Sequence, residues 1–243
     1  MECQIFLEWI YLNKMKKILF LTAIAFSMFS CSKTETGNLE LSGEVKGLKQ
    51  GTIYIKTANE TGLVTLDSII FEGKSNFITS LNIEEPQVLY FSLNRGISNS
   101  EDNNLMFFAE PGKMKITTSL DRFYGDVAIE GSENQNLLDK YFLSKRALIN
   151  RQNDLIKDQM LYSKSGFQNK ADSLDILIQR STGRIYLNAV NFVFKNKDKE
   201  VAPYVTLTEI APISDMYLDT IQKSLPENIL NSLYGKALQD LNQ

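Results

Sequence analysis

Apolar and polar residues alternate in short runs between residues 39 and 129. Leu39, Leu41 and Val45 open the pattern, and Ile53 and Ile55 continue it. The later runs occupy residues 63–71, 77–83, 88–93, 105–109, 114–118 and 127–129. Gly, Asn and Pro separate the runs, which is typical of antiparallel strands. We therefore predict about eight strands that form an antiparallel β-sandwich or barrel over residues 39–131.

The connections between these runs contain residues that turns require. Pro111 and Gly112 fit a type II turn, because Pro fixes φ at the first central position and Gly accepts positive φ at the next. Gly47, Gly51 and Glu72-Gly73-Lys74 are expected to close other hairpins.

The period of the apolar positions changes from two to about 3.6 after Gly131. Ser132 opens this region, and Gln135 three residues later completes a capping-box pattern. The apolar positions from Leu138 to Ile156 predict one face of a long helix, which residues 163–166 should end.

A second helix is predicted from the apolar positions between Leu174 and Val193, giving an antiparallel helical hairpin. Ala202-Pro203 should start a shorter helix, and amphipathic segments at 214–225 and 226–241 finish the chain. We therefore expect an α-helical domain at residues 132–243. Its apolar stripes are interpreted as core positions; a partner-binding seam or a membrane-surface helix is the alternative.

Composition excludes several classes of mechanism. The chain of 243 residues has no histidine, so His-based nucleophile activation and an ordinary catalytic zinc site cannot be assembled. Lys and Arg total 26 against 29 Asp and Glu, so no basic excess favours nucleic acid as a partner. Carboxylate, Lys or Tyr chemistry remains open, and we expect no cofactor and no metal.

The N-terminus has the features of a secretion signal. Lys16 and Lys17 precede an apolar run at 18–29, which is shorter than the ~20 residues that span a bilayer. Met28-Phe29-Ser30-Cys31 resembles the lipobox of bacterial lipoproteins. We therefore predict a signal peptide at residues 1–30, whose true start is Met15, and lipid attachment at Cys31. Residues 31–38 are expected to form a flexible tether.

A series of motifs in fixed order resembles a known family. The motifs are Leu41 to Leu48, Thr52-Ile53-Tyr54-Ile55, Leu66 to Ile69, Gly73 to Phe77, Phe108 to Met114, Gly131 to Asn134, and the helical stretch 224–241 with Tyr234-Gly235-Lys236. They are similar to the domain of unknown function (DUF4369-type) that precedes the thioredoxin module in many envelope-anchored bacterial thiol-disulfide oxidoreductases.

The resemblance implies the architecture of that family but not its activity. In the oxidoreductases a thioredoxin domain with a CxxC motif follows the helical region, whereas this chain ends at Gln243. Its cysteines are Cys3 and Cys31, both near the N-terminus, so no CxxC pair exists. The family's catalytic cysteines therefore have no counterpart here, and we expect no catalytic residue.

Other candidate sites are each weighed against a simpler structural interpretation. The oxygen-rich loop 98–104 could hold calcium but lacks the spacing of a dedicated site. Glu84-Glu85 is interpreted as a turn, and one of Tyr90 and Phe91 should face the core. The triplets Asp67-Ser68-Ile69, Asp172-Ser173-Leu174 and Asp219-Thr220-Ile221 resemble an O-glycosylation acceptor pattern.

These observations favour a non-catalytic, membrane-anchored lipoprotein that serves as a binding or scaffold module of the cell envelope. Its expected location is the periplasmic face of the outer membrane or the cell surface, and its expected partner is an envelope protein or glycan. An accessory or truncated member of a thiol-disulfide oxidoreductase system is the first alternative. A carboxylate-dependent hydrolase is a less favoured one.

Overall fold

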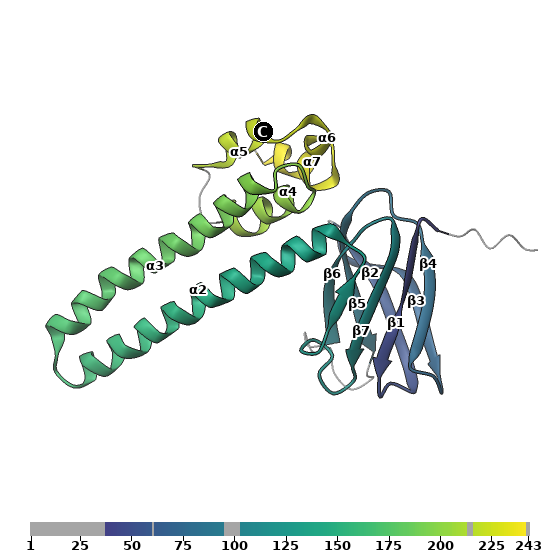
Figure 1. Cartoon of the computed structure of the whole chain (residues 1–243), viewed down its shortest axis with the longest axis horizontal. Helices are drawn as coiled ribbons and strands as arrows, with labels where there is room; N and C mark the ends of the chain where they lie inside the picture. Colours follow the sequence, from purple (N-terminus) through teal and green to yellow (C-terminus); the bar gives the residue numbers. More distant parts are fainter. Residues whose placement is uncertain (1–36, 60, 95–102, 213–215, 242–243) are drawn as a thin grey trace, which may run out of the picture. The chain divides into compact units, whose positions relative to one another are not determined.

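The structure is a computed structural model that describes residues 37–59, 61–94, 103–212 and 216–241. Gly37–Gln243 form one compact unit, in which a β-sandwich is followed by a helical region (Figure 1). This arrangement confirms the predicted fold class. The strands are β1 (Leu39–Lys46), β2 (Gln50–Asn59), β3 (Gly62–Glu72), β4 (Asn76–Leu81), β5 (Gln87–Asn94), β6 (Asn104–Ala109), β7 (Gly112–Ser119) and β8 (Ala128–Glu130).

The strands form two sheets with the orders β4-β1-β7-β8 and β3-β2-β5-β6. The alternating apolar side chains point between the sheets and form the sandwich core. Phe91, Phe107 and Ile116 are fully buried there, and the ring of Phe91 stacks on that of Phe123. Packing of this kind fills the space between two sheets and excludes water from it.

Three of the expected hairpin turns are instead crossings between the sheets. The connections at Gly47 to Gly51, at Glu72-Gly73-Lys74 and at Pro111-Gly112 each join a strand of one sheet to a strand of the other. Gly112 does adopt the positive φ that its turn was predicted to need, at +127°. The period of two predicts strands but does not say which strands pair, so this part of the prediction was wrong.

One strand pair is parallel. β1 pairs in parallel with β7, with Leu39 opposite Gly112, while the other pairs are antiparallel. The cause is the crossing at Pro111-Gly112, which delivers β7 to the first sheet beside β1 and in the same direction. The sheets are therefore largely, but not wholly, antiparallel.

The helical region begins where the period changes. Its helices are α2 (Glu133–Lys164), α3 (Gln168–Lys195), α4 (Val201–Val205), the π-helix η3 (Thr206–Ile210), α5 (Leu218–Ser224), α6 (Glu227–Leu230) and α7 (Leu233–Asp240). The predicted hairpin of α2 and α3 and its break at 163–166 are confirmed. The last predicted segment is split in two, because Ser232 caps a new helix by accepting a hydrogen bond from the Gly235 N–H.

The helices pack on the outer face of the second sheet. Val88 and Phe108 are buried in a cluster with Leu138 of α2 and Leu238 of α7. The ring of Phe108 lies edge-on to those of Tyr204 and Tyr234, with centroids 5.7 and 5.9 Å away. Strands β5 and β6 therefore contribute one face to the sandwich core and the other to the helical core.

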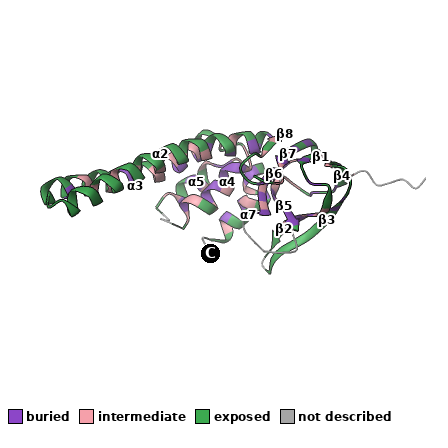
Figure 2. Cartoon of the chain, turned by 90° about the horizontal axis from the view of Figure 1, so that it is seen from below, coloured by how far each residue is buried: buried purple, intermediate pink, exposed green. Residues whose placement is uncertain are grey.

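The apolar stripes of α2 and α3 were predicted to be buried along the whole hairpin. In the far half, which lies away from the sandwich, that prediction was wrong. No third element of the described chain covers this half, and most of its residues are exposed (Figure 2). Exposed apolar residues there are Ile156, Met160, Leu161, Phe167, Ile176 and Leu177. In the half that meets the sandwich, Leu138, Tyr141, Ala189 and Val193 are buried, whereas in the far half Ala171 is the one apolar side chain of the described helices that is fully buried. A helical period marks a stripe but does not supply the neighbour that would bury it.

Asn38, which the sequence placed in the flexible tether, is held against the sandwich. Its side chain donates to the carbonyl of Ile83 at 2.7 Å and accepts from the Ile83 N–H at 2.9 Å. Residues 1–36, with the predicted signal peptide and most of the tether, lie outside the described residues. Within the described ranges, none of the helices combines the length and the apolar content that crossing a membrane requires.

Candidate functional site

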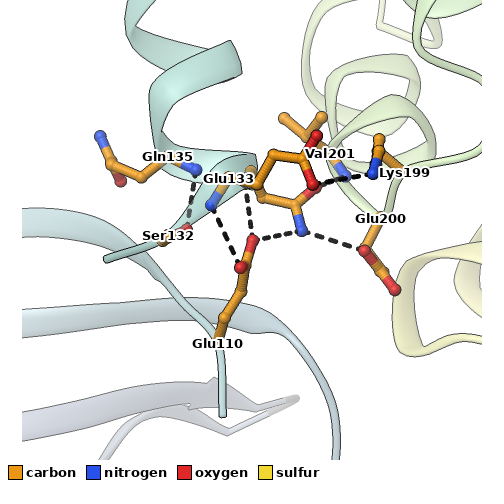
Figure 3. Close-up of polar contacts among 8 residues, drawn as sticks. Glu110, Ser132, Glu133, Gln135, Lys199, Glu200 and Val201 are labelled. Carbon is orange, nitrogen blue, oxygen red and sulfur yellow. Dashed lines mark hydrogen bonds and ion pairs between the residues drawn. The ribbon is translucent and has the colours of Figure 1, made fainter. Parts of the chain in front are cut away.

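The first turn of α2 is fixed to the sandwich by one carboxylate. Glu110, at the end of β6, accepts hydrogen bonds from the backbone N–H groups of Glu133 and Asn134 at 3.1 and 2.7 Å (Figure 3). It also accepts from the side-chain amide of Asn134 at 2.6 Å. The N-terminal N–H groups of a helix have no partner within the helix, and a negative charge there is favourable. Glu110 therefore acts as a cap supplied by the β-sandwich.

Asn134 extends this contact to α4. Its amide nitrogen also donates to Glu200 at 3.0 Å, and its amide oxygen accepts from the N–H of Val201 at 2.9 Å (Figure 3). An ion pair between Lys199 and Glu133, at 2.8 Å, lies beside it. We call Glu110, Glu133, Asn134, Lys199 and Glu200 the junction network. It joins β6, α2 and the start of α4.

The predicted capping box is half present. The Ser132 hydroxyl accepts from the Gln135 N–H at 2.9 Å, as expected. The Gln135 side chain, however, does not return to the cap residue: its oxygen accepts from the N–H of Phe108 at 2.6 Å, and its nitrogen donates to Asp139 at 2.7 Å. Because β6 is an edge strand, Gln135 satisfies a backbone donor that the sheet leaves unpaired.

A second helix is capped from the same end of the sandwich. Glu85, interpreted from sequence as part of a turn, accepts from the N–H of Leu233 at the start of α7, at 2.6 Å. Next to it the N–H of Val88 donates to the Tyr234 hydroxyl at 2.7 Å. Burial, the larger cause, raises the pKa of Tyr234 to about 12, and this hydrogen bond opposes the rise. Two carboxylates of the sandwich thus hold two helices.

A cleft opens between β6, the connection from β7 to β8, and α2, with a volume of about 480 Å³. Its apolar wall consists of Leu105, Met106, Val127, Ala128, Ile129, Phe142 and Leu143. Its polar lining consists of Tyr124, Gly125, Gln135, Asp139 and Arg146. Apolar walls with a few polar groups are typical of sites that bind a ligand or a segment of a partner.

The charged groups of the cleft lie along one face of α2. Asp139 and Arg146 are seven residues apart, which is about 10.5 Å along a helix. Burial raises the pKa of Asp139 above its ordinary value, and the hydrogen bond from Gln135 partly opposes this. Arg146 forms no ion pair with any residue that the structure describes. The cleft therefore offers one carboxylate and one separate guanidinium to an incoming molecule.

Some of the sites predicted from the sequence lie outside the residues that the structure describes. Cys31 lies outside the described residues, so lipid attachment there stays a prediction. Residues 98–102 of the oxygen-rich loop 98–104 also lie outside them, and Asn104 at its end accepts from the Ser92 hydroxyl at 2.6 Å. No group of three or more His, Cys, Asp or Glu residues in the described ranges could hold a metal ion.

The remaining candidates are placed clearly. Phe91 faces the sandwich core and Tyr90 packs against the helical cluster, so neither lines the cleft. The hydroxyl residues of the three glycosylation-like triplets, Ser68, Ser173 and Thr220, are exposed. Sequence reasoning missed the cleft and both caps from the sandwich. The motif Phe108 to Met114 contained Glu110, but nothing in the sequence linked that residue to α2, more than twenty residues away.

The protein is a β-sandwich that is joined to a helical hairpin by the junction network, and a cleft lies between the two parts. Residues 39–138 match a family described as Domain of unknown function (DUF4369). That part of the chain, which runs from β1 to the start of α2, is a DUF4369-type domain, as its motifs indicated. It includes Glu110, Asn134 and Gln135, so the family region contains the contacts that fix α2. No curated protein and no solved structure matches the chain.

Proposed function

We propose that the protein is a non-catalytic binding module of the bacterial cell envelope, anchored to a membrane through lipid on Cys31. The observation that supports it best is the cleft between β6 and α2. Its wall is apolar, and its polar groups come from different elements, which suits recognition of a chain-like partner with both apolar and charged groups. An envelope protein segment or a glycan has this chemistry.

The junction network supports a binding role because it gives the cleft a fixed wall. Binding is tighter when a site does not have to be ordered first. Gln135 adds to this support, since its side chain accepts from the Phe108 N–H of β6 and donates to Asp139 of the cleft. Arg146, without an ion partner in the described chain, provides a charge for a carboxylate or a sulfate of the partner.

Site-specific photo-crosslinking in living cells tests the cleft. A benzoylphenylalanine at position 124 replaces a tyrosine that lines the cleft and is 61% exposed. The control is the same replacement at Ile78, which is 71% exposed on β4, at the opposite edge of its sheet from β8. We expect an adduct from position 124 that is lost on Arg146→Gln. Equal adducts from both positions, or none from position 124, would contradict the proposal.

The anchor is tested by the intact mass of the chain extracted from membranes. A chain that starts at Cys31 and has the added mass of acyl groups supports the proposal. An unmodified chain that still contains residues before Cys31 overturns the anchor, without affecting the cleft.

The resemblance of the sequence motifs to the domain that precedes thioredoxin modules motivates a second candidate, an accessory of an envelope thiol-disulfide system. The DUF4369-type domain would then bring a redox partner to the membrane, and the partner would carry the CxxC motif. An adjacent reading frame for a thioredoxin-like protein would support this candidate. The hydrolase alternative needs two facing carboxylates, and the cleft lining contains one, Asp139.

A further inference from the structure

Three arginines gather around a hollow on the flank of the helical hairpin. The hollow has a volume of about 100 Å³ and lies between α2 and α3. Its lining consists of Arg151, Leu155, Leu177, Arg180, Ser181 and Arg184. It is separate from the cleft, because the two share no lining residue.

Hydrogen bonds join the two helices at the level of this hollow and beyond it toward the tip of the hairpin, so its residues are held in register. The side chain of Gln152 donates to the Thr182 hydroxyl at 2.7 Å, and that of Gln159 donates to Asp175 at 3.1 Å. Arg151 on α2 is therefore held opposite Arg180 and Arg184 on α3. Their proximity is a property of the fold rather than of one side-chain rotamer.

The positive charge at the hollow is not neutralised within the described chain. None of the three arginines forms an ion pair with a described carboxylate. Arg180 and Arg184 are also four residues apart on one helix, and like charges at that spacing are unfavourable. In a chain whose formal net charge is −3, this local excess of positive charge favours an anion.

A buried hydroxyl points to the same ligand. Ser181 is 7% exposed and lines the hollow, and its hydroxyl makes no hydrogen bond to another described residue. It offers a neutral donor between the guanidinium groups, whose planar forks match the oxygens of a phosphate. At ~30 Å³ for each water, the hollow holds about three water molecules, which is room for one small anionic group.

We propose that Arg151, Arg180, Ser181 and Arg184 form a binding site for a phosphate group. The group can belong to a free phosphate or pyrophosphate, or to the phosphomonoester headgroup of a lipid. The chemistry of the contacts is the same in both cases, with the guanidinium groups and the hydroxyl donating to phosphate oxygens. This proposal does not depend on the function of the cleft.

Calorimetric titration of the full chain in a non-ionic detergent tests the proposal. One arm uses pyrophosphate, and a second uses dihexanoyl phosphatidic acid below its micelle concentration, with dihexanoyl phosphatidylcholine as its control. We expect saturable binding in at least one of the first two arms, weakened by added NaCl. Tighter binding of phosphatidic acid than of pyrophosphate identifies a lipid headgroup, and the reverse identifies a soluble phosphate.

Variants distinguish a specific binding site from a general attraction of anions to positively charged residues. The double variant Arg180→Gln and Arg184→Gln is expected to weaken binding at least about tenfold, because it removes charge-assisted hydrogen bonds. Ser181→Ala should weaken it to a smaller extent. Lys157→Gln removes one charge from the outer surface of α2 and should leave binding unchanged.

Circular dichroism shows whether each variant keeps its helices, so loss of fold is not mistaken for loss of the site. The proposal is overturned if the folded double variant binds like the unaltered chain. It is also overturned if the unaltered chain binds neither pyrophosphate nor phosphatidic acid.

Discussion

Single carboxylates of the sandwich accept hydrogen bonds from the first turns of two helices. Glu110 accepts from two N–H groups at the start of α2, and Glu85 accepts from one at the start of α7, although both helices follow much later in the chain. Most N-terminal caps come from the residue just before the helix. Here Ser132 supplies such a local cap for α2, and Glu110 adds a second one from β6. Each contact therefore stabilises the helix and its attachment to the sheet together.

Replacing Glu110 tests this arrangement. Glu110→Ala leaves the N–H groups of Glu133 and Asn134 and the amide of Asn134 without their acceptor. We expect the free energy of unfolding to fall by about 1–3 kcal/mol, as for loss of hydrogen bonds to a charged group. Urea titration followed by circular dichroism measures it. Glu72→Ala, at an exposed carboxylate at the end of β3, is the matched control and should change stability little; an equal loss in both variants would contradict the cap.

The raised pKa of Asp139 predicts a pH-dependent effect of one substitution. Because its folded-state pKa lies above 3.8, ionisation of this carboxyl opposes folding at neutral pH, and the penalty disappears as the pH falls below 3.8. Asp139→Asn should therefore stabilise the protein at pH 7 by less than about 1 kcal/mol, since the carboxyl is only partly buried and solvent screens its charge. Thermal melts across the acid range measure it. A stabilisation that persists unchanged at acid pH would contradict this account.

At the residue scale, the sequence predicts contacts between near neighbours and misses those between distant ones. Ser132 was identified as a cap because Gln135 lies three residues away. The partners of the Gln135 side chain could not be predicted in full, because Phe108 is twenty-seven residues distant. The cleft was missed for the same reason: Tyr124, Asp139 and Leu105 are brought together only by the packing of α2 on β6.

At the scale of elements, the turn between β8 and α2 depends on a glycine. Gly131 has φ +95°, and a Cβ atom there would lie 2.1 Å from the carbonyl oxygen of Lys113. The turn therefore needs both the left-handed backbone and the missing side chain. Close approach to β7 is what places Ser132 and α2 beside the end of β6.

Two glycine substitutions separate the backbone effect from the steric one. Gly73 has a similar φ of +85°, but nothing lies within 4 Å of its Cβ position. Gly73→Ala should cost about 1–2 kcal/mol from the left-handed backbone alone. Gly131→Ala should cost distinctly more and should also lower the helical signal, because α2 is displaced. Chemical denaturation compares the two variants, and equal losses would contradict a steric role for Gly131.

The elements themselves were predicted well, but their partners were not. Alternation located the strands, and the helical period located α2 and α3 with their break. The predicted strand pairing was wrong where β6 and β7 were expected to form a hairpin. The same turn residues can close a hairpin within one sheet or connect strands of two sheets. Burial was wrong for the outer half of α2 and α3, because an apolar stripe is the same in sequence whether or not another element covers it.

At the scale of the whole molecule, the sandwich and the helices share a core. Val88 and Phe108 of the sheet are buried with residues of α2, α3, α4 and α7. A boundary at residue 131 therefore marks a change of secondary structure within one compact unit, Gly37–Gln243. We expect strands and helices to unfold together in a single transition.

Tyr234→Phe probes this shared core. The variant leaves the Val88 N–H without its acceptor and should cost about 1–3 kcal/mol. Because burial raises the pKa of Tyr234 to about 12, ionising its phenol opposes folding, so stability is fully present below pH 10 and falls as the pH rises through 12. The alkaline loss of stability should therefore be shallower in the variant. Calorimetric scans at several pH values measure both effects; two separate transitions, or an unchanged alkaline slope, would contradict the shared core.

Hydrogen exchange tests the central claim, a binding cleft between β6 and α2, most directly. Exchange of the purified chain is measured with and without a detergent extract of envelopes from cells that lack the chain. The account predicts slower exchange in the β7–β8 connection around residues 124–129 and in α2 around residues 139–146, and no such change in the Arg146→Gln variant. Unchanged exchange in these segments, with protection confined to other surfaces of the molecule, would contradict it.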